Sequence, residues 1–147
     1  TNLVIVGSGK EKENLLDIID ENNLSNNVEI VDEVDRECLI SFYENASVLI
    51  VSSREEGGPR VALEALLRGI KVISTKVGHM PDILDGRYLC NPNSLDDLSE
   101  LLKNSINQIS NIDQSSAFEK VRADFTFTKA NNNLLSIYTN LLDSDIG

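Results

Sequence analysis

The sequence predicts an α/β protein built on a doubly wound parallel sheet with helices on both faces. Short apolar runs alternate with longer helical patterns along the 147 residues, which is typical of parallel strands covered by helices. Hydrophobic residues make up 41% of the chain and charged residues 25%, the composition of an ordinary globular protein. We therefore expect one domain that covers residues 1–147.

Five strands are expected where the apolar runs occur. They cover Leu3–Val6, Val28–Val31, Val48–Val51 and residues 72–74, with a weaker strand near residues 88–89. The expected helices cover residues 10–21, Arg36–Asn45, a segment from Pro59, a segment from Leu95, and residues 128–142. The polar stretch at residues 104–116 is expected to hold a helix end and a loop.

Apolar residues at helical spacing predict which face of each helix meets the sheet. In the helix at residues 10–21 the inward residues are Leu15, Leu16, Ile18 and Ile19. In the helix Arg36–Asn45 they are Leu39, Ile40, Phe42 and Tyr43. In the helix capped by Asn93 and Ser94 they are Leu95, Leu98, Leu101 and Leu102.

The most informative segment is residues 52–69, which joins an expected buried strand to an expected helix. Pro59 suits the first helical position, where its missing N–H costs nothing, and Gly69 suits the position just past the helix end. Gly57 and Gly58 therefore lie between a strand end and a helix N-terminus. Backbone N–H groups and the positive end of a helix dipole favour a phosphate or a sugar hydroxyl at such a place.

Two carboxylates accompany this loop. Glu56 precedes the helix, and Glu64 follows eight positions later in its second turn. Carboxylates so placed can accept hydrogen bonds from hydroxyls while the amides hold an anion, and a nucleotide-sugar carries both kinds of group. An alternative for Glu64 is surface ion pairing with Arg60 and Arg68, which lie four residues to either side.

A second glycine turn, Gly7-Ser8-Gly9, follows a strand and precedes a helix, as a phosphate loop does. The third glycine of the dinucleotide fingerprint is missing, because Lys12 stands in its place. Two interpretations stay open: a tight strand-to-helix turn, or a turn that lines a ligand cleft. Elsewhere, the only histidine, His79, is expected to be a solvent-facing loop residue rather than a general base.

The net charge of −11 argues against several classes of partner. Affinity for a phosphate backbone comes from clustered Lys and Arg, so we expect no binding to nucleic acid or to an anionic lipid surface. No apolar run approaches the roughly 18 residues of a membrane span, and the sequence shows no signal-peptide pattern. Cys38 and Cys90 are isolated, which predicts reduced thiols, no metal site and a cytoplasmic location.

The segment from Glu56 to Glu64 resembles the E-x7-E motif of the glycosyl transferases group 1 family, retaining glycosyltransferases with two Rossmann-like domains in the GT-B arrangement. Four other segments resemble that family in the same order along the chain. They are the strand and glycine turn at residues 3–9, the strand and helix at residues 28–43, the loop at residues 74–83, which is similar to a G-G-x-P-E loop, and the closing segment with Phe125, Thr126, Phe127, Tyr138, Leu141 and Leu142.

The resemblance implies the C-terminal, donor-binding half of such an enzyme. Glu56 would be the catalytic carboxylate that reaches the hydroxyls of the donor sugar, and Glu64 would bind both ribose hydroxyls of the nucleotide. The remaining donor-binding residues would be Gly7, Ser8, Gly9, Gly57, Gly58, Pro59 and Val61. Three positions depart from the family pattern: His79 stands where the family usually has the second glycine of its loop, Asp32 replaces a common glycine near the nucleotide base, and Asp82 replaces the usual Glu.

The implied substrate is a nucleotide-diphospho-sugar, with no cofactor and no metal. In the family a strand and helix precede the strand at Leu3, and their loop supplies an Arg and a Lys that clamp the diphosphate. By the usual strand order the missing strand lies between the strands at Leu3 and Val48. Three explanations of the missing strand stay open. The strands at Leu3 and Val48 pair directly with each other, or another chain fills the gap, or the chain is a cut from a longer protein. We favour the last of these. An acceptor glycan or lipid-linked glycan would bind the missing N-terminal domain, and any membrane association would come from the missing part.

The function that the sequence predicts is transfer of a sugar with retention, in the synthesis of a surface polysaccharide, by the full-length protein and not by this fragment alone. Two alternatives stay open. The first is a non-catalytic nucleotide-binding or regulatory domain of Rossmann-like fold. The second is a nucleotide-sugar epimerase or a phosphorylase of the same two-domain fold.

Overall fold

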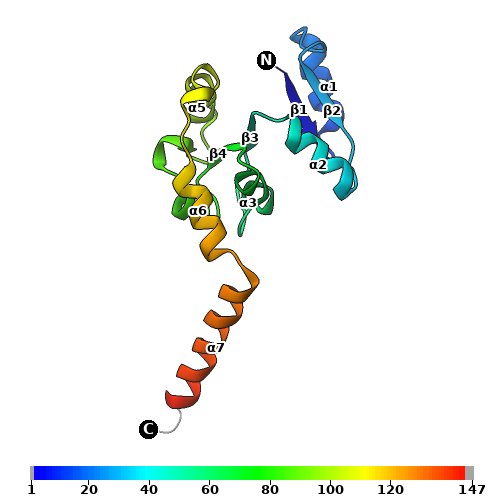
Figure 1. The fold of residues 1–147 in the computed structure, drawn as a ribbon. Helices are drawn as coiled ribbons and strands as arrows, with labels where there is room; N and C mark the ends of the chain where they lie inside the picture. The colour runs from blue at the N-terminus through cyan, green and yellow to red at the C-terminus, as the bar shows by residue number, and fades with distance from the viewer. Residues whose placement is uncertain (1, 145–147) are drawn as a thin grey trace. The chain divides into compact units, whose positions relative to one another are not determined.

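The computed structural model describes residues 2–144, with side chains described through residue 139. The chain forms two compact units, Thr1–Asn45 and Ala46–Gly147, and each is described by itself (Figure 1). Both units contain parallel strands joined by helices, so the predicted α/β class is confirmed. Whether the units form the single domain expected from chain length stays a prediction.

The first unit holds a two-stranded parallel sheet. Strand β1 (Leu3–Val6) pairs in register with β2 (Val28–Val31), so that Leu3 lies opposite Val28. Helix α1 (Lys12–Glu21) connects them, and α2 (Arg36–Asn45) follows β2. Both strands and α2 have the predicted bounds. Helix α1 begins two residues later than expected, because the chain first makes a turn in which the N–H of Lys12 donates to the carbonyl of Gly9.

The predicted inward face of α1 is only partly correct. Ile19 is buried and Leu15 is half-buried, but Leu16 and Ile18 are 46% and 45% exposed. A two-stranded sheet is too narrow to cover four apolar side chains of one helix, which explains the difference. On α2, Tyr43 is buried and the other three predicted residues are half-buried.

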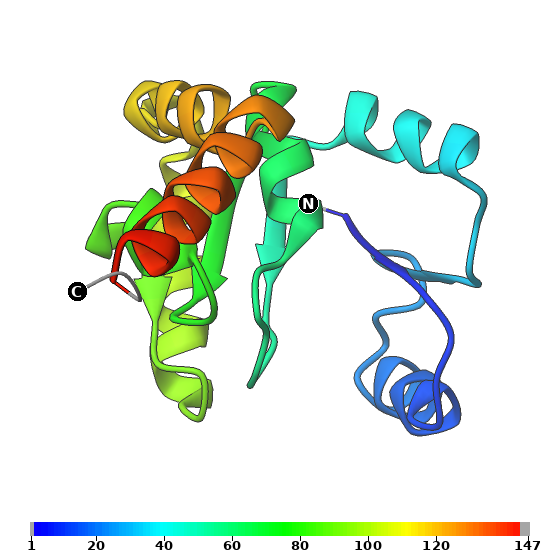
Figure 2. The same cartoon turned by 90° about the horizontal axis from the view of Figure 1, so that it is seen from below.

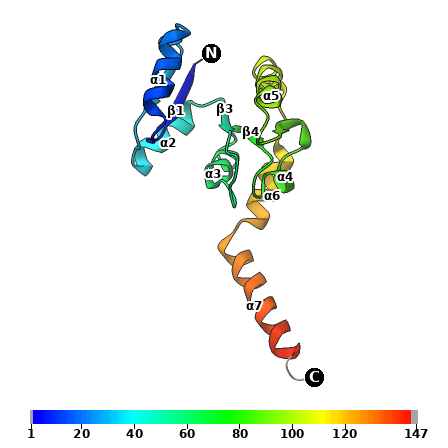
Figure 3. The same ribbon diagram turned by 180° about the vertical axis from the view of Figure 1, so that it is seen from behind.

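The second unit holds a three-stranded parallel sheet in the order β3-β4-β5. Its strands are β3 (Val48–Val51), β4 (Lys71–Thr75) and β5 (Leu89–Cys90). Its helices are α3 (Arg60–Leu67), α4 (Met80–Ile83), α5 (Leu95–Asn107), α6 (Ser115–Asp124) and α7 (Phe127–Ser144), with 3-10 turns at Gly86–Tyr88 and Ile109–Asn111. Helix α6 packs beside α3 and α4, which can be followed in Figures 1 and 3.

Several features of this unit differ from the sequence prediction, and β4 extends the expected strand by one residue at each end. Helices α4 and α6 were not expected, and α6 begins inside the stretch that was expected to be a loop. Strand β5 begins one residue later, because Asp85 accepts a hydrogen bond from the N–H of Arg87 and starts a 3-10 turn. By contrast, Ser94 caps α5 as predicted, since its hydroxyl oxygen accepts from the N–H of Asp97.

The core of the second unit lies between α3, β4 and α4. Its fully buried side chains include Ala62, Ala65, Val72, Ile73 and Met80. This core fixes the end of β3 and the start of α3, which is where the candidate site lies.

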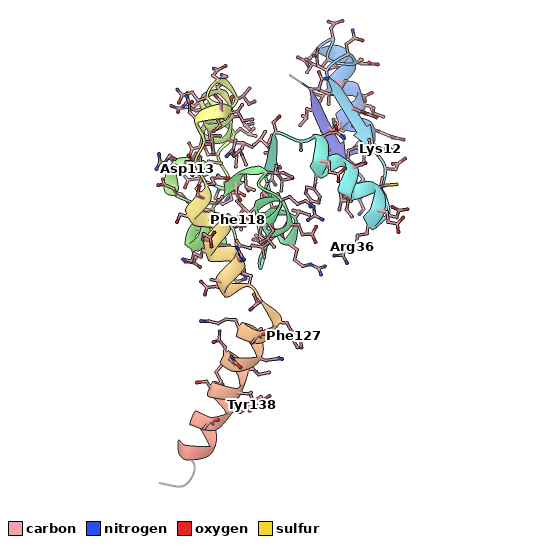
Figure 4. The ribbon with its side chains drawn as sticks, in the orientation of Figure 1. Lys12, Arg36, Asp113, Phe118, Phe127 and Tyr138 are labelled. Carbon is pink, nitrogen blue, oxygen red and sulfur yellow. The ribbon has the colours of Figure 1, made fainter. Side chains whose placement is uncertain are left out.

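The last helix confirms the predicted amphipathic segment and extends it by one residue at its start and two at its end. It continues from α6 after a short bend at residues 125–126 (Figure 2). Phe127 and Tyr138, labelled in Figure 4, are 82% and 58% exposed. The side chains of Leu141 and Leu142 lie outside the described residues.

Candidate functional site

The Glu56 carboxylate lies on the loop between β3 and α3, and hydrogen bonds fix that loop. The Ser53 hydroxyl donates to Oε1 of Glu56 over 2.9 Å. The backbone carbonyl of Ser53 in turn accepts a hydrogen bond of 2.7 Å from the hydroxyl of Thr75, which is buried at the end of β4. Two hydrogen bonds therefore connect the sheet to Glu56, and they orient an exposed carboxylate.

Helix α3 starts one residue later than predicted. Pro59 has φ −69° and ψ 101°, an extended conformation, so it flanks the helix and Arg60 is the first helical residue. The other end agrees with the prediction, because Gly69 follows the helix with φ +75°. The N–H of Gly69 donates to Leu66, and the N–H of Ile70 donates to Ala65, which is the Schellman arrangement.

Glu64 and Val61 lie on α3 itself. Glu64 is half-buried and Val61 is 42% exposed. Arg68, the predicted ion-pair partner in the alternative interpretation, donates from its guanidinium to the backbone carbonyl of Glu64 over 3.3 Å. The E-x7-E segment therefore places one carboxylate before the helix and one within it.

The loop after β4 packs directly on the glycines of the Glu56 loop. Gly78 has φ +48°, and a Cβ atom there would lie 2.6 Å from the carbonyl oxygen of Gly57 and 2.8 Å from Cα of Gly58. Backbone atoms cannot move aside as the end of a side chain can, so Gly78 must be glycine. The segment similar to a G-G-x-P-E loop thus supports the E-x7-E segment, a contact that spacing alone did not indicate.

The glycine turn Gly7-Ser8-Gly9 lies in the first unit, between β1 and α1. Gly7 has φ +144°, and its N–H donates to the carbonyl of Val31. Next to this turn Lys12, labelled in Figure 4, forms an ion pair with Asp32 after β2. Lys12 and Asp32, which each stand where a glycine was expected, are therefore partners. Of the predicted site residues, Gly7, Ser8 and Gly9 belong to the first unit and Glu56, Gly57, Gly58, Pro59, Val61 and Glu64 to the second.

An open hollow of about 240 Å³ lies between β5 and α5 in the second unit, away from the predicted residues. Asp97, which lines it, accepts hydrogen bonds from the side chains of Ser94 and Asn91, and these bonds lower the pKa of Asp97 below its ordinary value. Glu100 and Lys76 also line the hollow. Two carboxylates at this place oppose the binding of a diphosphate, so the hollow is a poor donor site.

Among residues 2–139, whose side chains the structure describes, no group of three or more His, Cys, Asp or Glu is arranged to hold a metal ion. In the same part of the chain no helix is both long and apolar enough to cross a membrane.

The fold and the loop define a parallel α/β domain of the kind found in GT-B glycosyltransferases. The chain belongs to the glycosyl transferases group 1 family, whose model matches residues 1–133. The family and the fold class predicted from the sequence are thereby confirmed.

Curated relatives agree with this assignment. An uncharacterized glycosyltransferase of Methanocaldococcus jannaschii is 32% identical over 109 residues, covering 72% of this chain and 31% of the relative. The O-antigen biosynthesis glycosyltransferase WclY of Escherichia coli is 27% identical over 143 residues, covering 94% of this chain and 38% of the relative. The chain therefore spans about a third of the length of the curated relatives that it matches.

Solved structures show the same fold. Sucrose-phosphate synthase of Thermosynechococcus elongatus matches 97% of this chain and 39% of its own, with a TM-score of 0.77 and 23% identity. Anabaena HepE in complex with UDP-glucose matches 95% of this chain and 41% of its own, with a TM-score of 0.76 and 19% identity. At these identities the likeness extends to the fold alone.

Proposed function

We propose that this chain is the donor-binding half of a retaining glycosyltransferase that uses a nucleotide-diphospho-sugar. The observation that carries the proposal is the pair of carboxylates around the glycine loop at the start of α3, with Glu56 held by Ser53. The family assignment supports transfer of a sugar, and one structure of the same fold contains UDP-glucose.

Each residue of the loop has a distinct role in this proposal. The Glu64 carboxylate accepts hydrogen bonds from both ribose hydroxyls, which one carboxylate can do. Glu56 accepts from hydroxyls of the donor sugar. Gly57 and Gly58, which lack side chains, let the backbone approach the diphosphate, and Pro59 and Val61 complete the wall at the start of the helix. For the glycine turn at residues 7–9 of the first unit we also propose a role in donor binding.

The chemistry follows from charge. When the glycosidic bond to the donor phosphate breaks, negative charge grows on the leaving diphosphate. The positive end of the α3 dipole stabilises that charge without any metal ion or cofactor. We propose that an Arg and Lys pair from a segment outside this chain completes the stabilisation, and that the sugar is transferred with retention of configuration.

The proposal for the whole protein goes further than this chain. An N-terminal domain binds an acceptor glycan or lipid-linked glycan, and the product belongs to a surface polysaccharide, as the relatives in O-antigen and amylovoran biosynthesis suggest. The protein works in the cytoplasm, and any association with the inner face of the membrane comes from the part outside this chain. The 147-residue chain alone is expected to show no transferase turnover.

A titration of the 147-residue chain with UDP, GDP, ADP and their sugars, followed by backbone amide shifts, tests the donor role. We expect shifts at Gly57, Gly58 and Glu64 with one preferred nucleotide. In the whole protein, product analysis separates transfer to an acceptor from epimerisation and from release of a sugar phosphate. Full activity of the Glu64→Gln variant would overturn the proposal in favour of a non-catalytic domain.

A further inference from the structure

His79 makes a contact that its exposure alone would not suggest. A Cβ atom on Gly58 would lie 2.8 Å from Nε2 of the His79 ring and closer still to its Cδ2 atom. The backbone of Gly58 is not in the left-handed region, so its φ angle would accept alanine. The imidazole ring therefore occupies the space where a side chain of residue 58 would stand.

A second aromatic ring holds His79 in this place. The rings of His79 and Phe125 meet edge to face, with centroids 5.4 Å apart and an interplanar angle of 64°. Such pairs are a favoured aromatic geometry. Phe125 follows α6, whose Val121 and Ala117 side chains are buried in the core of the second unit. The His79 ring thus packs against Phe125 at the end of α6 on one side and against Gly58 of the loop on the other.

We propose that His79 is a positioning residue for donor binding, which sets the conformation of the loop at residues 56–58 by packing its ring against the backbone of Gly58. The inference rests on the proposed function. The proposed role of His79 is steric, because its ring fills space beside a glycine. The role involves no proton transfer, so any flat ring of similar size can replace the imidazole.

The position of His79 predicts that binding of the sugar end of the donor depends on this residue more than binding of the nucleotide end. The ring touches the loop that carries Glu56, the proposed partner of the donor sugar. Glu64, the proposed partner of the ribose, lies within α3, whose ends are fixed by the core and by Gly69. Loss of the ring is therefore expected to weaken binding of the nucleotide-sugar more than binding of the bare nucleotide. A general loss of folding would weaken both equally.

The first experiment tests the contact without any ligand. Hydrogen exchange is measured in the whole protein that carries this chain, for the peptide that spans residues 52–60. We expect His79→Ala to speed exchange there by about tenfold, which corresponds to about 1.4 kcal/mol of lost local stability. His79→Phe is expected to keep the exchange rate of the unmodified protein. A rate in His79→Ala equal to that of the unmodified protein would overturn the inference whatever the ligand data show.

The second experiment measures dissociation constants for UDP-glucose, GDP-mannose and ADP-glucose beside UDP, GDP and ADP. His79→Ala is expected to raise the constant for the preferred nucleotide-sugar by about tenfold and that for its nucleotide by less than about threefold. His79→Phe should restore both. The matched control is Glu119→Ala, an exposed position on α6, which should change neither.

Each outcome has a definite meaning. The positioning role would be overturned if His79→Ala lost equal affinity for the nucleotide-sugar and for the nucleotide. Failure of His79→Phe to restore binding would overturn it as well. If the unmodified protein binds none of the six ligands, the proposed function fails and the donor part of this inference fails with it, while the exchange result still decides the contact.

A double substitution gives an independent check. Gly58→Ala alone is expected to collide with the ring and to speed exchange of the same peptide. In the His79→Ala background the ring that Gly58→Ala would meet is gone, so Gly58→Ala should add almost nothing. Additive effects of the two substitutions would show that the ring and Gly58 do not share this space.

Discussion

The side chain of Gln114 pairs with the backbone of Val72 as a neighbouring strand would. Its Oε1 accepts from the N–H of Val72 over 2.8 Å, and its Nε2 donates to the carbonyl of Val72 over 2.7 Å. Both residues are buried and lie 42 positions apart. Strand β5 pairs with β4 only at Ser74 and Thr75, so the amide of Gln114 satisfies the edge of β4 that β5 does not reach. The start of α6 is thereby joined to the sheet.

Replacement of Gln114 by alanine should destabilise the second unit. The change leaves a buried N–H and a buried carbonyl of Val72 without their partner, which costs about 1–3 kcal/mol for an unsatisfied group. Urea unfolding of the chain measures the loss. The control is Gln108→Ala, an exposed glutamine before the second 3-10 turn, where a change within about 0.5 kcal/mol is expected. Equal losses at both positions would contradict this account of Gln114.

Removal of the Thr75 hydroxyl should loosen the Glu56 loop. Thr75→Val keeps the shape of the side chain but leaves the carbonyl of Ser53 without its 2.7 Å hydrogen bond, at a cost of about 1 kcal/mol. Hydrogen exchange of residues 52–60 should become faster. Thr75→Ser, which keeps the hydroxyl, should retain the slow exchange, and a similar acceleration in both variants would show that packing rather than the hydroxyl holds the loop.

The stability of the second unit should depend on pH through Asp97. Hydrogen bonds from Ser94 and then Asn91 lower the pKa of Asp97 in the folded state. A carboxyl whose folded pKa lies below its unfolded value adds stability above the unfolded pKa, about 3.9, and this stability is lost as the pH falls through the folded pKa.

The Asp97→Asn variant should therefore be less stable than the unmodified chain at pH 7, with the difference shrinking below about pH 4. Urea unfolding between about pH 2.5 and pH 7 measures this dependence. The control is Asp96→Asn, at the neighbouring exposed carboxylate of the same helix end. It should reduce the pH dependence of the free energy of unfolding by less than Asp97→Asn does. A difference between Asp97→Asn and the unmodified chain that stays constant across this range would contradict the prediction.

Glu56 and Glu55 should differ sharply in donor binding, although they are adjacent. Glu56 accepts the hydrogen bond of Ser53 and has the spacing of the E-x7-E segment, whereas Glu55 has neither property. In the whole protein, Glu56→Gln should weaken binding of the preferred nucleotide-sugar by about 10- to 100-fold, the effect of losing a charged hydrogen bond. Glu55→Gln is the matched control, and a loss as large at Glu55 would refute the assignment.

The sequence determined local features whose cause lies within a few residues. Val28–Val31 and Val48–Val51 are strands because they are short apolar runs with β-branched residues, and α2 has its predicted bounds for a similarly local reason. Gly69 ends α3 because only glycine readily takes φ +75°. The order of the motifs also indicated the family, since five segments resemble that family in the same order along the chain.

Only the tertiary structure decided how distant residues meet. Helix α6 has weak amphipathic spacing, and its place follows from the pairing of Gln114 with Val72, which no local pattern encodes. The contact of His79 with Gly58 joins loops that are 21 positions apart, and the link from Thr75 through Ser53 to Glu56 begins on another strand. These contacts arise from the packing of parallel strands side by side. Local propensity selects a strand or a turn, but the register of neighbouring strands sets which loops touch.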